Sequence, residues 1–302
     1  MDKALDELRR LAANAENRRT ETGIPRVAMV QGQIPDHALA AVYEPMINLI
    51  LQGSKSMTVG GKTLHYDPAT YFIMSVDLPA VGAVHPASTG EPYLAVSLTL
   101  DANVVSALLC DTTDPANGCG EPSSQTEAFN VAAVTPDLMD AWVRMLRLME
   151  RPNEIPALAP AYEREILYRV LQGPQGYMLR QLATPDSALA RISSAIQRIR
   201  RDYSKPLRIA SLAEQVAMSE SSFHRHFKSA TALSPLQYQK QLRLLQARQI
   251  LATQGKSVTT AALEVGYESP TQFTREYTRA FGLPPSQDAA RMVASWRGKA
   301  AH

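Results

Sequence analysis

The chain of 302 residues is 45% hydrophobic and 20% charged, an ordinary globular composition with enough length for two domains. It has no apolar run of 18 residues and its start lacks the apolar core of a signal peptide, so we expect no membrane-spanning helix and no membrane partner. The net charge of +2 is unevenly spread: residues 187–302 hold 17 Lys and Arg against 7 Asp and Glu, a net of +10, and residues 1–186 carry −8, which favours nucleic acid as a partner of the basic part.

Short segments rich in β-branched and aromatic residues predict strands between residues 45 and 100. These segments are MINLILQG, SKSMTV, KTLHY, YFIMSV and YLAVSLTL. Gly60 and Gly61 in VGGK predict a two-residue hairpin, because glycine tolerates the positive φ of both central positions. Asp67-Pro68 and Glu91-Pro92 indicate later turns. Several short strands joined by tight turns favour a small barrel or sandwich.

After about residue 101 the hydrophobic period becomes helical. Asp101 is expected to cap one helix, Thr135 with Pro136 to begin a second, and Gly173 to end a third. The helices from Pro136 to Gly173 either pack on the sheets or pair with a second copy of the chain, and both possibilities stay open. A linker at 184–187 precedes a segment that looks wholly helical, with breaks at 204–206, 232–235, 255–257 and 282–285.

One pattern occurs twice in the basic part. LAEQVAMSESSFHRHFK begins at Leu212, and AALEVGYESPTQFTREYT begins at Ala261. Phe223 recurs 50 positions later as Phe273, and the arginine two residues after each recurs with it. Each copy has the length and residue order of a helix-turn-helix, at about 209–230 and 258–281. In the second copy we expect Ser269 at the N-cap, the next residue at the first helical position, and Gln272 completing a capping box.

The second helix of each copy has an apolar and a cationic side. At 100° per residue, Phe223 and Phe227 share one stripe, and Phe273 and Tyr277 share the corresponding one. Opposite these stripes lie Arg, Lys, Ser and Thr side chains with no acid near the centre. Arginine bonds guanine through two donors, and Ser, Thr and Lys bond phosphates or base edges. The alternative is two ordinary solvated helix surfaces, but the same face recurs at a fixed offset in a basic segment.

Between the copies lies SPLQYQKQLRLLQARQILAT, an amphipathic stretch that predicts one long helix. About 18 helical residues span ~27 Å. That length is near the ~34 Å spacing of successive major grooves, so one chain is expected to read two adjacent grooves.

At these residues the sequence resembles the AraC/XylS family of bacterial transcription regulators, over about residues 190–293. The likeness is carried by LAEQVAMSESSFHRHFK, SPLQYQKQLRLLQAR and ALEVGYESPTQFTREYTRAFGLPPSQ. Residues from Tyr43 to Val84 are similar to the AraC-type N-terminal domain, which has a cupin-like barrel. The sequence departs from the family at Ala232, where Gly is usual, and at Ala261, where a larger aliphatic residue is common.

The resemblance implies a set of DNA-contacting positions on the two helices. By position, Ser221, His224 and Arg225 fall on the family's first base-facing set, and Thr271, Thr274 and Arg275 on the second. With their polar neighbours these residues form the two predicted reading faces. The first reading face is Ser221, Ser222, His224, Arg225 and Lys228, and the second is Thr271, Gln272, Thr274, Arg275 and Arg279.

The predicted fold class is α+β with two domains. Residues 1–186 are expected to form a sensor or dimerisation domain, with a cupin-like β-barrel at about 25–100 and flanking helices at about 101–186. Residues 187–302 are expected to form an all-α DNA-binding domain of two helix-turn-helix units joined by a long helix. The predicted function is sequence-specific regulation of transcription, with activation expected. The expected partners are a double-stranded DNA operator, RNA polymerase, a small-molecule effector and a second copy of the chain.

The sequence contains little that indicates an enzyme or a metal site. A cupin metal site needs an H-x-H pair, but His65 is followed by Tyr66 and Asp67, and His85 has no second histidine near it. We expect His65 to pack beside a strand and His85 to lie in a loop. The motifs G-x-S-x-G, G-x-x-x-x-G-K and G-x-G-x-x-G are absent. We therefore expect no catalytic residue, metal or cofactor, and the alternative is a cupin-type metal enzyme carrying a DNA-binding tail. His224 and His226 point about 200° apart on a helix and cannot share a metal.

Two further groups are candidates for sensing. Tyr71, Phe72 and Met74 are candidates for lining an effector pocket in the barrel, although core packing is the favoured role for each of them. Cys110 and Cys119 are too few for a disulfide framework, which fits a reducing cytoplasm. Acidic neighbours would raise their thiol pKa values, which disfavours redox sensing.

Overall fold

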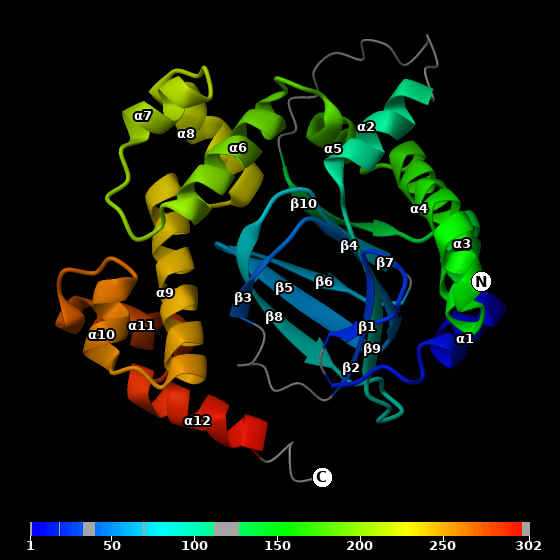
Figure 1. The fold of residues 1–302 in the computed structure, drawn as a ribbon, viewed down its shortest axis with the longest axis horizontal. Helices are drawn as coiled ribbons and strands as arrows, with labels where there is room; N and C mark the ends of the chain where they lie inside the picture. Colours follow the sequence, from blue (N-terminus) through cyan, green and yellow to red (C-terminus); the bar gives the residue numbers. More distant parts are fainter. Residues whose placement is uncertain (1, 18, 33–39, 69, 112–126, 298–302) are drawn as a thin grey trace.

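The computed structural model describes residues 2–17, 19–32, 40–68, 70–111 and 127–297. Two antiparallel sheets lie at the centre, helices α1–α5 lie on one side of them, and helices α6–α12 lie on the other (Figure 1). The strands are β1 (Thr20–Glu21), β2 (Val27–Gly32), β3 (Ala40–Tyr43), β4 (Met46–Gln52), β5 (Ser54–Val59), β6 (Lys62–Tyr66), β7 (Thr70–Met74), β8 (Leu78–His85), β9 (Tyr93–Thr99) and β10 (Phe129–Ala133). The α-helices are α1 (Asp2–Leu11), α2 (Ala102–Asp111), α3 (Pro136–Arg147), α4 (Ile155–Gln172), α5 (Gly176–Ala183), α6 (Ala188–Arg201), α7 (Ile209–Gln215), α8 (Glu220–Thr231), α9 (Pro235–Gln254), α10 (Val258–Glu264), α11 (Pro270–Phe281) and α12 (Pro285–Arg297).

The two sheets confirm the predicted α+β class. One has the strand order β1-β2-β9-β4-β7-β10 and the other the order β3-β8-β5-β6. The predicted two-residue hairpin joins β5 to β6, where Val59 pairs with Lys62. Gly60 has the expected positive φ, at +59°, whereas Gly61 does not, so the prediction of positive φ at both central positions is wrong for Gly61. Strand β10 lies beyond the segment in which strands were predicted, and it pairs with β7 across a long stretch of sequence. Such a pairing is set by tertiary contacts, so the local pattern did not indicate it.

Successive side chains along the central strands point to opposite faces of the sheet, and they therefore contribute to two separate hydrophobic cores. In β4, Leu49 belongs to the core under helices α1–α5, and Ile50 belongs to the core between the two sheets. In β7, Ile73 and Phe72 divide in the same way. Both strands are buried on both faces, which explains why their sequences are nearly continuous apolar runs.

The core between the sheets continues into the helical part. Val59 and Leu78 of the sheets share one buried cluster with Phe223, Phe227 and other residues of α6–α9. The amide of Ala128 donates to the carbonyl oxygen of Ala230 at 3.3 Å. The first helix-turn-helix unit therefore packs directly on the sheets, and a domain boundary at residue 186 stays a prediction.

Local capping sets several of the helix ends. The Thr135 hydroxyl accepts from the Leu138 amide at 3.2 Å, and the Asp101 carboxylate accepts from the Asn103 amide at 2.9 Å, as predicted. Gly173 ends α4, but its φ of −84° and ψ of 178° are extended rather than left-handed. Within the residues described, no helix is both long and apolar enough to cross a bilayer.

Candidate nucleic-acid interface

The first unit consists of α7, a tight turn and α8. Ala217 in the turn has a φ of +52°, and the Ser219 hydroxyl caps α8 by accepting from the Ser222 amide at 3.3 Å. Phe223 and Phe227 are fully buried and pack at a ring distance of 5.5 Å. The predicted apolar stripe is therefore confirmed as the side of α8 that fixes its rotation.

That rotation turns the first reading face outward. Ser221, His224, Arg225 and Lys228 are exposed, and Ser222 is half-buried. Burial, with a smaller contribution from the Arg225 charge, lowers the pKa of His226, so this imidazole is neutral at pH 7. Its Nε2 lies 3.4 Å from an Arg225 guanidinium nitrogen. This neighbour steadies the arginine without neutralising its charge.

The second unit repeats the arrangement with α10 and α11. Gly266 has a φ of +90°, at the position of the turn that Ala217 occupies in the first unit, and a Cβ there would lie 2.0 Å from the Ser204 carbonyl oxygen. Ser269 caps α11 by accepting from the Gln272 amide at 3.3 Å, as predicted. The expected capping box is wrong in its second half, because the Gln272 side chain donates to Glu276 at 3.3 Å and does not turn back to the N-cap. Glu276 lies one turn further along the helix, and the hydrogen bond that it accepts from Gln272 Nε2 holds this side chain away from the N-cap.

The second reading face is a shallow open hollow along α11. It is lined by Thr271, Thr274, Arg275, Thr278 and Arg279. The hydroxyls of Thr274 and Thr278 donate to carbonyl oxygens one turn back, at 2.9 and 2.8 Å. Gln272 is exposed beside the hollow. Four of the five predicted side chains thus lie together in the hollow, along with Thr278, which the helical period also places on the outward side.

The cations of the two faces differ from the other arginines of the helical part. Among the described residues, no carboxylate lies within ion-pair distance of Arg225, Lys228, Arg275 or Arg279. By contrast, the Arg248 guanidinium is 6% exposed and pairs with the buried Asp288 at 2.8 Å. Net charge alone did not separate these two classes, because the distinction depends on where each side chain lies.

A residue that sequence reasoning missed joins the two units. Arg243, near the middle of α9, donates to the carbonyl oxygens of Tyr203, Ser204 and Lys205 before the first unit and of Gly266 in the second. The donor–acceptor distances lie between 2.7 and 3.1 Å. With its 20 residues, α9 is ~30 Å long. One rigid helix and one guanidinium therefore fix the second unit relative to the first.

Another missed residue, Asp77, joins the helical part to the sheets. Its carboxylate is 3% exposed and accepts from Gln197 and Arg200 of α6. Its carbonyl oxygen accepts from the Tyr238 hydroxyl of α9 at 2.9 Å. An isolated acid after a strand gives no sequence signal for such a role, because all three donors come from more than 100 residues away.

The candidate effector residues do not share one face. Phe72 and Met74 lie in the core between the sheets, and Tyr71 lies in the core under α1–α5. His65 is exposed on β6, and His85 is the last residue of β8 and not part of a loop. Cys110 is exposed, whereas Cys119 lies outside the described residues.

Comparison with known proteins places these features in a family. The profile of the AraC-type transcriptional regulator N-terminus matches residues 23–178, and that of a helix-turn-helix domain matches residues 212–291. The thermoregulatory protein LcrF of Yersinia pestis is 22% identical over 268 residues, which are 87% of this chain and 93% of the relative. The virulence regulon transcriptional activator VirF of Yersinia enterocolitica is similar to the same extent.

Solved structures show the same fold. A single-residue variant of apo ToxT from Vibrio cholerae superposes with a TM-score of 0.57 and 10% identity, over 90% of this chain and 98% of that one. Wild-type ToxT with an unsaturated fatty acid bound gives a TM-score of 0.53 at 10% identity, over 83% and 88%.

Proposed function

The chain belongs to the family of AraC-type transcriptional regulators, and from this we propose that it reads two successive major grooves of one operator with α8 and α11. The supporting observation is the pair of outward faces whose cations have no ion-pair partner among the described residues. Guanidinium and ammonium groups left unpaired on an exposed face are available to phosphates and base edges. The length of α9 suits the groove spacing of ~34 Å.

Each face combines a base-reading arginine with groups that position the helix. Arg225 and Arg275 are the candidates for bidentate contact with guanine. Because the Thr274 hydroxyl donates within its own helix, the side chain offers its methyl group, which suits the methyl of thymine. Lys228 is the candidate for a phosphate contact, and Ser221, at a base-facing position, is a candidate for bonding a base edge.

The test measures binding of the full chain to its preferred site, selected from random duplexes. Arg225→Ala and Arg275→Ala should each weaken binding about 5- to 150-fold and relax the preference at one base pair, in different half-sites. Lys205→Ala is the matched control, because Lys205 is exposed in the same basic part but lies outside both reading helices. If both arginine variants keep the wild-type base preference, the assignment of the reading faces is wrong.

We propose that regulation acts through the N-terminal part and that it activates transcription in the cytoplasm. The activator VirF, similar over most of this chain, supports activation and hence contact with RNA polymerase. Pairing of two chains would involve helices α3 and α4, where Tyr168 is an exposed aromatic residue. We assign the chain a role in regulation rather than in catalysis.

The effector is proposed to bind between the two sheets and to carry an acidic group. Among the described residues, Lys55 is buried there without a carboxylate partner, and the buried hydroxyls of Tyr66 and Tyr93 have no hydrogen-bond partner. Such donors favour an anion, because buried polar groups are stabilised only when they are bonded. The fatty acid bound to ToxT supports this class of effector. Lys55→Met should weaken the binding of oleate at least tenfold in a titration, and unchanged binding would reject the site.

A further inference from the structure

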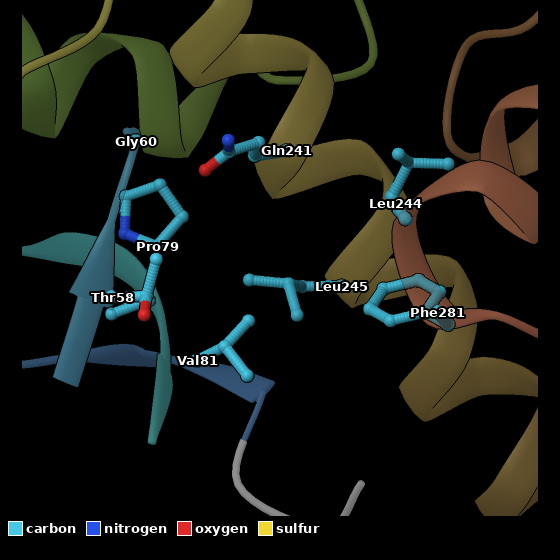
Figure 2. Close-up of a pocket in the computed structure, with 10 residues that line it drawn as sticks. Thr58, Gly60, Pro79, Val81, Gln241, Leu244, Leu245 and Phe281 are labelled. Carbon is cyan, nitrogen blue, oxygen red and sulfur yellow. The ribbon is translucent and has the colours of Figure 1, made fainter. Parts of the chain in front are cut away.

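A cavity of about 140 Å³ lies in the seam between the sheets and the second helix-turn-helix unit (Figure 2). The sheet side is formed by the β5–β6 hairpin and by β8, and the helical side by α9 and the last turn of α11. Val81 and Leu245 point toward each other across it, and Leu244 and Phe281 lie at the helical wall. The lining residues are Thr58, Gly60, Pro79, Ala80, Val81, Gln241, Leu244, Leu245, Ala280 and Phe281.

The lining defines the chemistry of an occupant. Most lining side chains are apolar, and none is charged. Gln241 offers an amide that forms no hydrogen bond with another described residue, and Figure 2 shows it at one end of the cavity. The volume is close to that of a cavity of about 150 Å³ that binds benzene in another protein, and it is too small for a long acyl chain. A neutral six-membered ring with one hydrogen-bonding substituent fits this lining.

The position of the cavity means that a bound ligand would affect how the second helix-turn-helix unit is held against the sheets. The first unit is already fixed to the sheets by the shared core and by Asp77. The second unit has its own separate core, and Phe281 at the end of α11 belongs to it. A ligand in the seam would therefore add contacts between β8 and the end of the second reading helix.

We propose that this seam cavity is a regulatory site for a small neutral ring compound, and that its occupation fixes α11 in the position seen here. The proposal rests on the assignment of α8 and α11 as the reading helices. A ligand that binds one arrangement stabilises that arrangement, and the coupling to DNA is reciprocal. Occupation of the cavity is thus expected to strengthen binding to paired half-sites and to leave a single first half-site unaffected.

The experiment titrates the full chain with phenol and follows Leu and Val methyl resonances. We expect saturable binding with a dissociation constant of about 1 mM or below, with shifts at Val81, Leu244 and Leu245. Val81→Phe should weaken it at least tenfold; Val81 is 43% exposed, so the larger side chain can be accommodated at the rim. Leu236→Phe is the control, because Leu236 is an exposed α9 residue outside the cavity and should leave binding unchanged.

A second variant tests the polar group. Gln241→Leu should weaken phenol about fivefold and leave toluene unaffected, which a general loss of structure would not do. Absence of saturable binding, or equal binding by wild type and Val81→Phe, would overturn the site. If phenol binds and the affinity for paired half-sites stays the same, the regulatory role is overturned. The arginine variants are tested on the preferred site without phenol, so a failure of the reading-helix assignment is distinguishable from a failure of the cavity.

Discussion

Replacing Asp288 with alanine would remove the carboxylate on which the second helix-turn-helix unit is assembled. Asp288 of α12 is fully buried and accepts from Arg248 of α9 at 2.8 Å, from the Tyr277 hydroxyl of α11 at 2.9 Å and from Arg291 at 2.6 Å. Three helices thus meet at one side chain, and α11 is the proposed second reading helix.

The expected cost follows from the burial of the partners. The Arg248 side chain is 6% exposed, and breaking a buried ion pair by deleting one member costs about 3–5 kcal/mol. Burial would raise the pKa of Asp288, but the hydrogen bonds from Arg248, Arg291 and Tyr277 together hold it below its usual value of 3.8. The stabilisation is therefore complete above about pH 4 and is lost as the pH falls through the lowered pKa.

Hydrogen exchange and urea unfolding measure the effect. In Asp288→Ala, amides of α10–α12 should exchange faster by two to three orders of magnitude, while those of α3 and α4 keep the wild-type rate. Affinity for paired half-sites should fall toward that for the first half-site alone. Glu264→Ala is the control, because its pair with Lys256 at 2.7 Å is partly exposed and should contribute less than about 1 kcal/mol. A loss in Asp288→Ala no larger than in this control would refute the reasoning.

Other predictions concern the sheets, the turns and the DNA contacts. Burial lowers the pKa of Lys55 to about 8 from its usual 10.5, so Lys55→Met should stabilise the protein at pH 7 by up to about 3 kcal/mol. Since the unfolded chain holds this proton more tightly, the difference should shrink between pH 8 and 10.5 in urea titrations, and a pH-independent difference would count against it. Ala232 has a φ of +57°, so Ala232→Gly should raise the unfolding free energy by about 0.5–1 kcal/mol, and a lower melting temperature would contradict this. Lys228→Ala should weaken all DNA sequences alike and reduce the slope of log affinity against log salt by about 1; a change confined to one base pair would instead indicate base reading.

The departures from the family pattern show how far local sequence reasoning reaches. Ala232 stands where the family usually has glycine. It adopts the same left-handed conformation as Gly282 at the end of α11. The helix end is therefore imposed by the packing that follows it, and alanine is tolerated there under strain.

Features that depend on neighbours within a few residues were determined by the sequence. The stripes of Phe223 with Phe227 and of Phe273 with Tyr277 follow from the helical period, and the turn at Gly60 follows from backbone sterics. These local patterns were enough to place α8 and α11 and to orient their outward sides.

Features that depend on distant partners were decided only by the tertiary structure. Whether an arginine is a candidate for reading DNA or a structural residue is one such feature: Arg275 is exposed, Arg243 bonds four carbonyl oxygens, and Arg248 is buried against Asp288. The composition does not distinguish these three arginines, because the role of each depends on carboxylates and carbonyl oxygens that only folding brings close to it. The seam cavity and the role of Asp77 have the same origin, since both exist only where the sheets meet the helices.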